Sequence, residues 1–264
     1  MPELHTTTLG TDGPLVAFCH GLFGQGRNWT QVAKALAGEN RVLMVDLPNH
    51  GRSAWTDRVD HLDMADRVAT LFSADDPVTL VGHSMGGKVA MALALRHPEL
   101  VERLAVVDVA PVTYPRMSTF AGYVAAMRSV DLASTGSRAE AEEGLRAGVP
   151  DPVVRGFLLQ NLRRSEDPSG GAGWRWQMNL QALGDQLEAI GAWPEQELAG
   201  VEPYAGPTVW IGGQDSDYIT AEHEAAMRRW FPRTRRVSVK GAGHWVHSEQ
   251  PEAFLSVLWV FLRG

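Results

Sequence analysis

The chain has 264 residues, a formal net charge of −7, 44% hydrophobic residues and one cysteine. This length and apolar content predict one large domain, or one domain with an insertion. The acidic balance argues against nucleic acid as a partner. A single cysteine excludes a disulfide framework, and no apolar run reaches the roughly 18 residues that span a bilayer.

In chain order, short apolar runs alternate with helical patterns. Because apolar strands that alternate with helices are typical of a parallel sheet covered on both faces, we expect an α/β fold of the doubly covered type. Strands are predicted at residues 15–19, 41–46, 78–81, 103–109, 208–211 and 235–239. Helices are predicted at residues 29–37, 62–72, 85–96, 221–230 and 251–262.

One interval, from Pro111 to about Pro207, contains no convincing strand. Four helix-compatible segments (118–130, 138–148, 152–163 and 180–190) and a glycine-rich stretch at 169–173 fill it. We therefore expect an α/β core formed by residues 1–111 and 207–264, with a helical insertion at 112–206.

Gly82-His83-Ser84-Met85-Gly86 lies between a predicted strand and a predicted helix. A turn this sharp strains the backbone of Ser84 and exposes its hydroxyl, which is typical of a nucleophile. A serine needs a base, and His244, in a loop after the last predicted strand, is our candidate, with His247 as the alternative. The amides of Leu22 and Met85 are the expected oxyanion donors.

The motifs around Gly21, Asn49, Ser84, Asp108 and His244 together resemble those of the α/β-hydrolase superfamily, and more narrowly those of the YbfF-type esterases. The resemblance covers about residues 15–262 and is weak in the insertion, which the family uses as a cap over the active site. It implies a serine hydrolase that cleaves carboxylic esters through an acyl-enzyme.

The carboxylate that holds His244 has two candidates. Asp215 follows a strand at the position that most α/β hydrolases use, whereas the YbfF-type group uses the aspartate that matches Asp108, with a serine that matches Ser216 relaying the contact. Spacing cannot decide between them, because either strand end can reach the histidine, and we favour Asp108.

Aromatic residues near the motifs are candidates for a substrate pocket: Phe23, Trp174, Trp176, Tyr218 and Trp245. For each of them, ordinary packing is the alternative. In addition, Arg175 could meet a substrate carboxylate at the cap entrance.

No zinc-type spacing, phosphate loop or dinucleotide motif is present in the sequence, so no metal and no cofactor are expected. We expect a small-molecule ester as the substrate, no membrane partner, a cytoplasmic location and a monomer or homodimer. Thioester or amide hydrolysis, carbon–carbon bond cleavage, perhydrolysis and acyl transfer are alternatives on the same triad. A non-catalytic ligand receptor is a second alternative, and it would show a broken triad.

Overall fold

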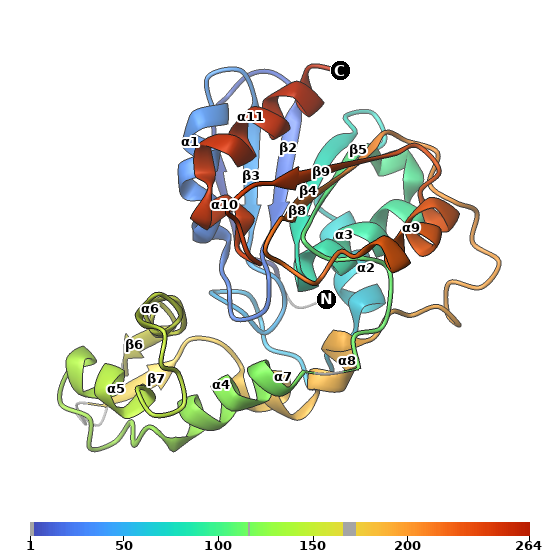
Figure 1. Ribbon diagram of the computed structural model, residues 1–264. Coiled ribbons are helices and arrows are strands. Elements are labelled where there is room, and N and C mark those ends of the chain that lie inside the picture. Colours follow the sequence, from blue (N-terminus) through green and yellow to red (C-terminus); the bar gives the residue numbers. More distant parts are fainter. Residues whose placement is uncertain (1–2, 116, 166–172) are drawn as a thin grey trace.

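The computed structural model describes residues 3–115, 117–165 and 173–264. Its centre is a seven-stranded sheet in the order β1-β3-β2-β4-β5-β8-β9 (Figure 1). All neighbouring strands are parallel except β1, which pairs antiparallel with β3. The strands are β1 (Thr6–Leu9), β2 (Leu15–Cys19), β3 (Arg41–Val45), β4 (Val78–His83), β5 (Val101–Val107), β8 (Thr208–Gly213) and β9 (Thr234–Val239).

Helices cover both faces of this sheet, each over its own core of buried side chains. Phe18 on β2 packs in the same cluster as Leu36 on α1 (Thr30–Leu36) and Leu258 on α11 (Pro251–Leu262). On the other face, α2 (His61–Ala69), α3 (Met85–Arg96) and α9 (Glu224–Trp230) bury their apolar side chains. The structure thus has the mostly parallel, doubly covered sheet that the alternation of strands and helices predicts, and this agrees with the α/β-hydrolase fold that the resemblance implies.

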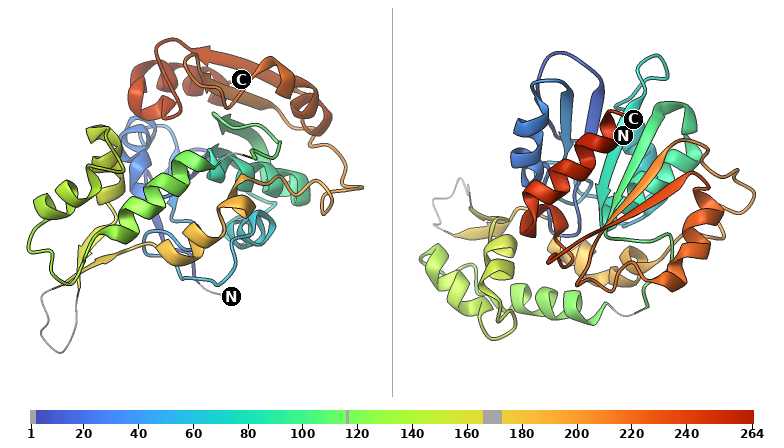
Figure 2. Two further views of the ribbon diagram at one scale, coloured as in Figure 1. Left: turned by 60° about the horizontal axis from the view of Figure 1, so that its bottom comes forward. Right: turned by 45° about the horizontal axis from the view of Figure 1, so that its top comes forward.

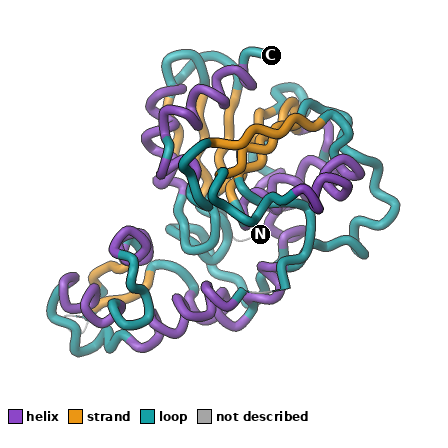
Figure 3. Tube along the Cα trace, in the orientation of Figure 1, coloured by secondary structure: helices purple, strands orange, loops and turns teal. Residues whose placement is uncertain are grey.

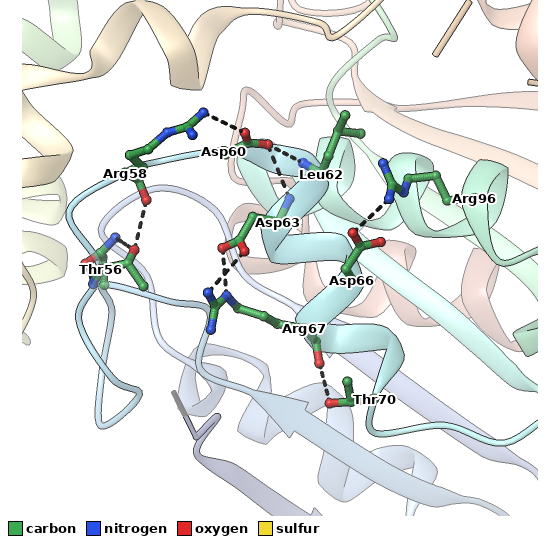
Figure 4. Close-up of polar contacts among 10 residues, drawn as sticks. Thr56, Arg58, Asp60, Leu62, Asp63, Asp66, Arg67, Thr70 and Arg96 are labelled. Carbon is green, nitrogen blue, oxygen red and sulfur yellow. Dashed lines mark hydrogen bonds and ion pairs between the residues drawn. The ribbon is translucent and has the colours of Figure 1, made fainter. Parts of the chain in front are cut away.

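The helix α2 shows how local sequence fixes an element that supports the site. Asp60 caps its first turn by accepting from the amides of Leu62 and Asp63, and Asp63 then pairs with Arg67 one turn later (Figure 4). Asp66 reaches Arg96 at the end of α3, so the two helices are joined where they pack side by side.

Residues between β5 and β8 form a separate group of elements at one end of the sheet (Figures 1 and 2). The tube in Figure 3 shows that this group is largely helical. It contains α4 (Ser118–Ser129), α5 (Arg138–Leu145), α6 (Pro152–Leu159), β6 (Leu162–Arg164), β7 (Trp174–Trp176), α7 (Leu180–Asp185) and α8 (Leu187–Gly191). The short helix α10 (Val246–Glu249) precedes α11.

Three differences from the sequence expectations are found here. The insertion is not purely helical, because β6 and β7 form a two-stranded antiparallel hairpin. Strands of three residues are too short to show an alternating pattern, so the sequence gives no signal for them. The helix expected over 180–190 is divided into α7 and α8 at Gln186, and the antiparallel edge strand β1 was not expected. Of the glycine-rich stretch 169–173, all but Gly173 lies outside the described residues.

Candidate active site

Ser84 lies in the sharp turn between β4 and α3. Its backbone has φ 53° and ψ −120°, a conformation that L-residues rarely adopt. The turn is possible because glycines flank it: a Cβ on Gly82 would come within 2.3 Å of the Gly86 carbonyl oxygen, and one on Gly86 within 2.4 Å of the His20 carbonyl oxygen. The strain predicted from the motif is therefore present at Ser84.

His244 connects Ser84 to a buried carboxylate. Its Nε2 lies 3.0 Å from Ser84 Oγ, and its Nδ1 lies 2.8 Å from Asp108 Oδ2. Asp108 has no exposed surface and also accepts from the Gly213 amide and from the Ser216 hydroxyl. These contacts match a nucleophile, a base and an orienting acid in hydrogen-bond contact.

Asp108, and not Asp215, lies beside His244 in the structure. Asp215 is exposed, and its amide donates to the carbonyl of Ala242, so it belongs to the turn after β8. Asp108 follows β5 with φ 50°, which turns its side chain across the edge of the sheet toward β8. Ser216 is in the position expected of the relaying serine.

The loop that carries His244 is fixed on both sides. Nε2 of His83 donates to the His244 carbonyl oxygen over 2.8 Å. The two carboxylate oxygens of Glu249 accept from the amides of Gly243 and Trp245, which flank the histidine. The ring of Tyr218 stacks on His244 with centroids 4.0 Å apart. These contacts limit rotation of the imidazole and keep it between Ser84 and Asp108.

The amides of Leu22 and Met85 occupy the expected positions for oxyanion donors. Met85 is the first residue of α3, where an amide has no acceptor within its own helix. Neither amide donates to another residue in the described part of the chain, so both remain able to bind an oxyanion. His20 supports the adjoining loop: its Nδ1 lies 2.8 Å from the Gly21 carbonyl oxygen, and its Nε2 accepts from the amide of Leu47.

A residue of the insertion also holds this loop, and sequence analysis did not identify it. Asn161 is fully buried; its Nδ2 donates to the Phe23 carbonyl oxygen over 2.8 Å, and its Oδ1 accepts from Gln25 Nε2 over 2.6 Å. The amide of Phe23 donates to His50 Nε2. The backbone of Phe23, which has φ 61°, is therefore held by Asn161 of the insertion and by His50 of the core. Leu22 directly precedes this fixed residue.

Two small cavities meet at Ser84. The first is lined by Gly21, Leu22, Asn28, Phe157 and Trp245, among others. The second is bounded by Leu22, Met85 and Lys88. The rest of its wall is mainly apolar and consists of Val109, Tyr114, Met117, Phe120, Ile190 and Tyr218. Each leaves about 20 Å³ for the centres of water-sized molecules, which is space for about one water.

The predicted substrate-binding aromatics separate into two groups. Tyr218 and Trp245 line the cavities at Ser84. Phe23 is fully buried in the loop after β2, and Trp174 and Trp176 lie on β7. The Trp176 indole donates to the Met127 carbonyl, inside the insertion, and the Arg164 guanidinium covers the Trp174 ring at 4.2 Å. None of these three side chains lines either cavity among the described residues.

Lys88 is a second residue of the site that the motif did not reveal. It is buried one turn after Ser84, and Nζ donates to the carbonyl oxygens of Gly191 and Ala192 at the end of α8. Burial lowers its pKa to about 7. Lys88 therefore ties α3, the helix that follows Ser84, to the end of α8 in the insertion.

Groups of three or more potential metal ligands are absent from the residues that the structure describes. Within the same residues, no helix has the length and apolar character that crossing a bilayer requires.

Burial raises the pKa of Cys19 to about 12, so this cysteine is an unreactive part of the core.

Residues 14–251 match the model of the alpha/beta hydrolase fold family. The chain belongs to this family. Over 94% of its length it is 38% identical to sn-1-specific diacylglycerol lipase ABHD11 of Mus musculus, covering 81% of that protein. It is 30% identical to Esterase YbfF of Escherichia coli strain K12, covering 94% of this chain and 92% of that one. A solved marine microorganism esterase superposes with a TM-score of 0.92 at 32% identity, over 99% of this chain and all of the other.

Proposed function

We propose that this chain is a serine hydrolase that cleaves carboxylic esters with Ser84 as nucleophile, His244 as base and Asp108 as the acid of the triad. The observation that carries the proposal is the continuous path from Ser84 Oγ through His244 to buried Asp108. Relatives named as an esterase and as a diacylglycerol lipase, over nearly the full chain, support ester cleavage as the reaction class.

In the proposed first half-reaction, Ser84 Oγ attacks the ester carbonyl carbon while His244 Nε2 takes its proton. The amides of Leu22 and Met85 stabilise the negative charge on the former carbonyl oxygen. The carbon–oxygen bond to the alcohol then breaks, and His244 returns the proton to the leaving oxygen.

In the second half-reaction, water attacks the carbonyl carbon of the acyl-enzyme while His244 takes one of its protons. The bond from that carbon to Ser84 Oγ then breaks, His244 returns the proton to Oγ, and the carboxylic acid leaves. Asp108 keeps the Nδ1 proton of His244 in place and stabilises the imidazolium that forms in each half. All of these steps use side chains and backbone amides of this chain.

The second cavity is proposed as the acyl site. Its wall of Val109, Met117, Phe120 and Ile190 is apolar, and its small size favours short acyl groups. The first cavity shares Asn28, Phe157 and Trp245 with an outer groove of about 310 Å³, which we assign to the alcohol part of the substrate.

Residues 112–206 are proposed to act as a cap, because Phe120 and Phe157 close the cavities from that side.

A p-nitrophenyl ester series from acetate to decanoate tests the proposal. We expect kcat/KM to be highest for acetate to butyrate, to decline for longer chains, and to be lost in Ser84→Ala. A folded Ser84→Ala variant that keeps wild-type turnover would refute the assignment of the nucleophile. Absence of turnover on any ester, with Ser84 still labelled by a fluorophosphonate, would favour acyl transfer or another reaction of the same triad.

A further inference from the structure

Five arginines from distant parts of the sequence converge where the insertion meets the core. Arg27 lies in a short 3-10 helix of the core (Gly26–Trp29), and Arg52 lies in the loop after β3. Arg138 begins α5, and Arg163 and Arg175 lie on β6 and β7. We call them the arginine patch. Three of them surround the end of α6: Arg27 and Arg163 donate to the Gln160 carbonyl oxygen, and Arg138 donates to that of Leu159.

The patch brings together positive charges from the core and from the insertion. Arg163 and Arg175 are direct partners across the β6–β7 hairpin, a pairing of like charges that destabilises a sheet. Burial lowers the pKa of Arg27; attraction by Asp46 opposes this, and repulsion from Arg138 and Arg52 adds to it. Burial also lowers the pKa of Arg163, and repulsion from the other four patch arginines adds to the effect.

In the described part of the chain, no carboxylate forms an ion pair with the patch. Arginines elsewhere pair with carboxylates, such as Arg67 with Asp63 and Arg228 with Glu224. By contrast, none of the five patch arginines forms an ion pair with a residue that the structure describes. Asp46 attracts Arg27, but it is buried and already accepts from the amides of Gly26 and Arg52. The end of α6 offers only the partial negative charge of a helix terminus.

The patch adjoins the opening of the proposed alcohol site. Asn28, which follows Arg27, lines both the first cavity and the outer groove. The Asn28 side chain donates to Gln160 Oε1, on the residue whose carbonyl holds Arg27 and Arg163. Asn28 thus connects the lining of the outer groove, which also includes Asp151 and Glu249, with the residue that Arg27 and Arg163 bind.

We propose that the arginine patch binds a phosphate group carried by the alcohol part of the substrate. Guanidinium groups match phosphate oxygens with paired, charge-assisted hydrogen bonds, and several converging arginines favour a dianion over a single carboxylate. The site would select phosphorylated over neutral alcohols at the step of substrate binding. This inference rests on the proposed ester hydrolysis at Ser84.

Direct titration of the full chain with pyrophosphate at low ionic strength tests the site without requiring turnover. The variant is Arg52→Gln/Arg175→Gln, since both side chains are exposed and neither donates a hydrogen bond to a described residue. We expect its Kd for pyrophosphate to rise about tenfold, as loss of two exposed charge-assisted contacts predicts. The matched control Arg233→Gln/Arg235→Gln removes two exposed arginines from the region of β9 and is expected to bind as wild type.

The kinetic arm compares 1-butyrylglycerol 3-phosphate with 1-butyrylglycerol. Wild type is expected to show about a tenfold higher kcat/KM for the phosphorylated ester, and the patch variant to lose that preference while it hydrolyses the neutral ester normally. Absence of pyrophosphate binding, or an equal loss in the control variant, would overturn the proposal. Binding to phosphatidylserine vesicles without a response to pyrophosphate would overturn it as well, because it would indicate a membrane surface. If neither ester is hydrolysed, the proposed function fails, and titration still decides whether the patch binds phosphate.

Discussion

Replacing Asp108 with asparagine tests which carboxylate orients the base. The asparagine can keep one oxygen at the Gly213 amide, which places its NH₂ group at the present position of Oδ2, beside Ser216 and His244. An NH₂ group cannot accept from His244 Nδ1, so the imidazole would carry its proton on Nε2 instead. In that tautomer it cannot take the proton of Ser84. By analogy with the same replacement in the serine-protease triad, kcat should fall about 10⁴-fold, or about 5 kcal/mol.

The assay is steady-state hydrolysis of p-nitrophenyl butyrate, with thermal unfolding measured on each variant to establish that it is folded. Asp215→Asn is the matched control, because Asp215 is exposed and is expected to leave kcat within twofold of wild type. If Asp215→Asn caused the large loss, or if a folded Asp108→Asn retained activity within tenfold of wild type, the assignment of the acid would be refuted.

Three further predictions concern the surroundings of the triad. Ser216→Ala removes a donor from the Asp108 carboxylate, and we expect kcat to fall roughly tenfold in the same ester assay, with an unchanged kcat contradicting the relay. Asn161→Ala leaves the buried Phe23 carbonyl without its donor, which should lower the free energy of unfolding by about 1–3 kcal/mol. We therefore expect a lower Tm and slower labelling of Ser84 by a fluorophosphonate. A lower Tm with normal labelling would show a purely structural role. Burial lowers the pKa of His50 to about 3 and that of His61 to about 4. Because the unfolded chain binds protons below about pH 6.5 and these buried rings do not, the free energy of unfolding should fall by about 2 kcal/mol per histidine between pH 7.5 and 5. Urea denaturation at the two pH values measures this, and equal stabilities would contradict the burial argument.

Much of the core could be predicted from the sequence because its signals are local. The strand leading to Ser84 is apolar and uninterrupted, and the helix after it begins directly at Met85. The glycines around the serine correspond to close backbone approaches, so this motif predicts its own geometry. His244 was identifiable because it lies in a short loop after the last strand.

The remaining features depend on contacts between residues far apart in the chain. The choice between Asp108 and Asp215 depends on the backbone turn after β5, which gives Asp108 a positive φ that spacing does not reveal. Asn161 binds a carbonyl 138 positions away, and neither its type nor its neighbours distinguish it from a surface asparagine. The hairpin of β6 and β7 was missed for a different reason, since its pairing joins segments too short to show a period.

The central claim, that an acyl group is transferred to Ser84, can be measured directly. Wild-type protein mixed with p-nitrophenyl butyrate and quenched in acid on the millisecond scale should give, by intact-protein and peptide mass spectrometry, a butyryl adduct on the peptide that contains Ser84. Ser84→Ala should give no adduct and no turnover. A butyryl group found on another residue, or rapid turnover without any adduct on wild type under conditions that trap a control serine esterase, would contradict the account.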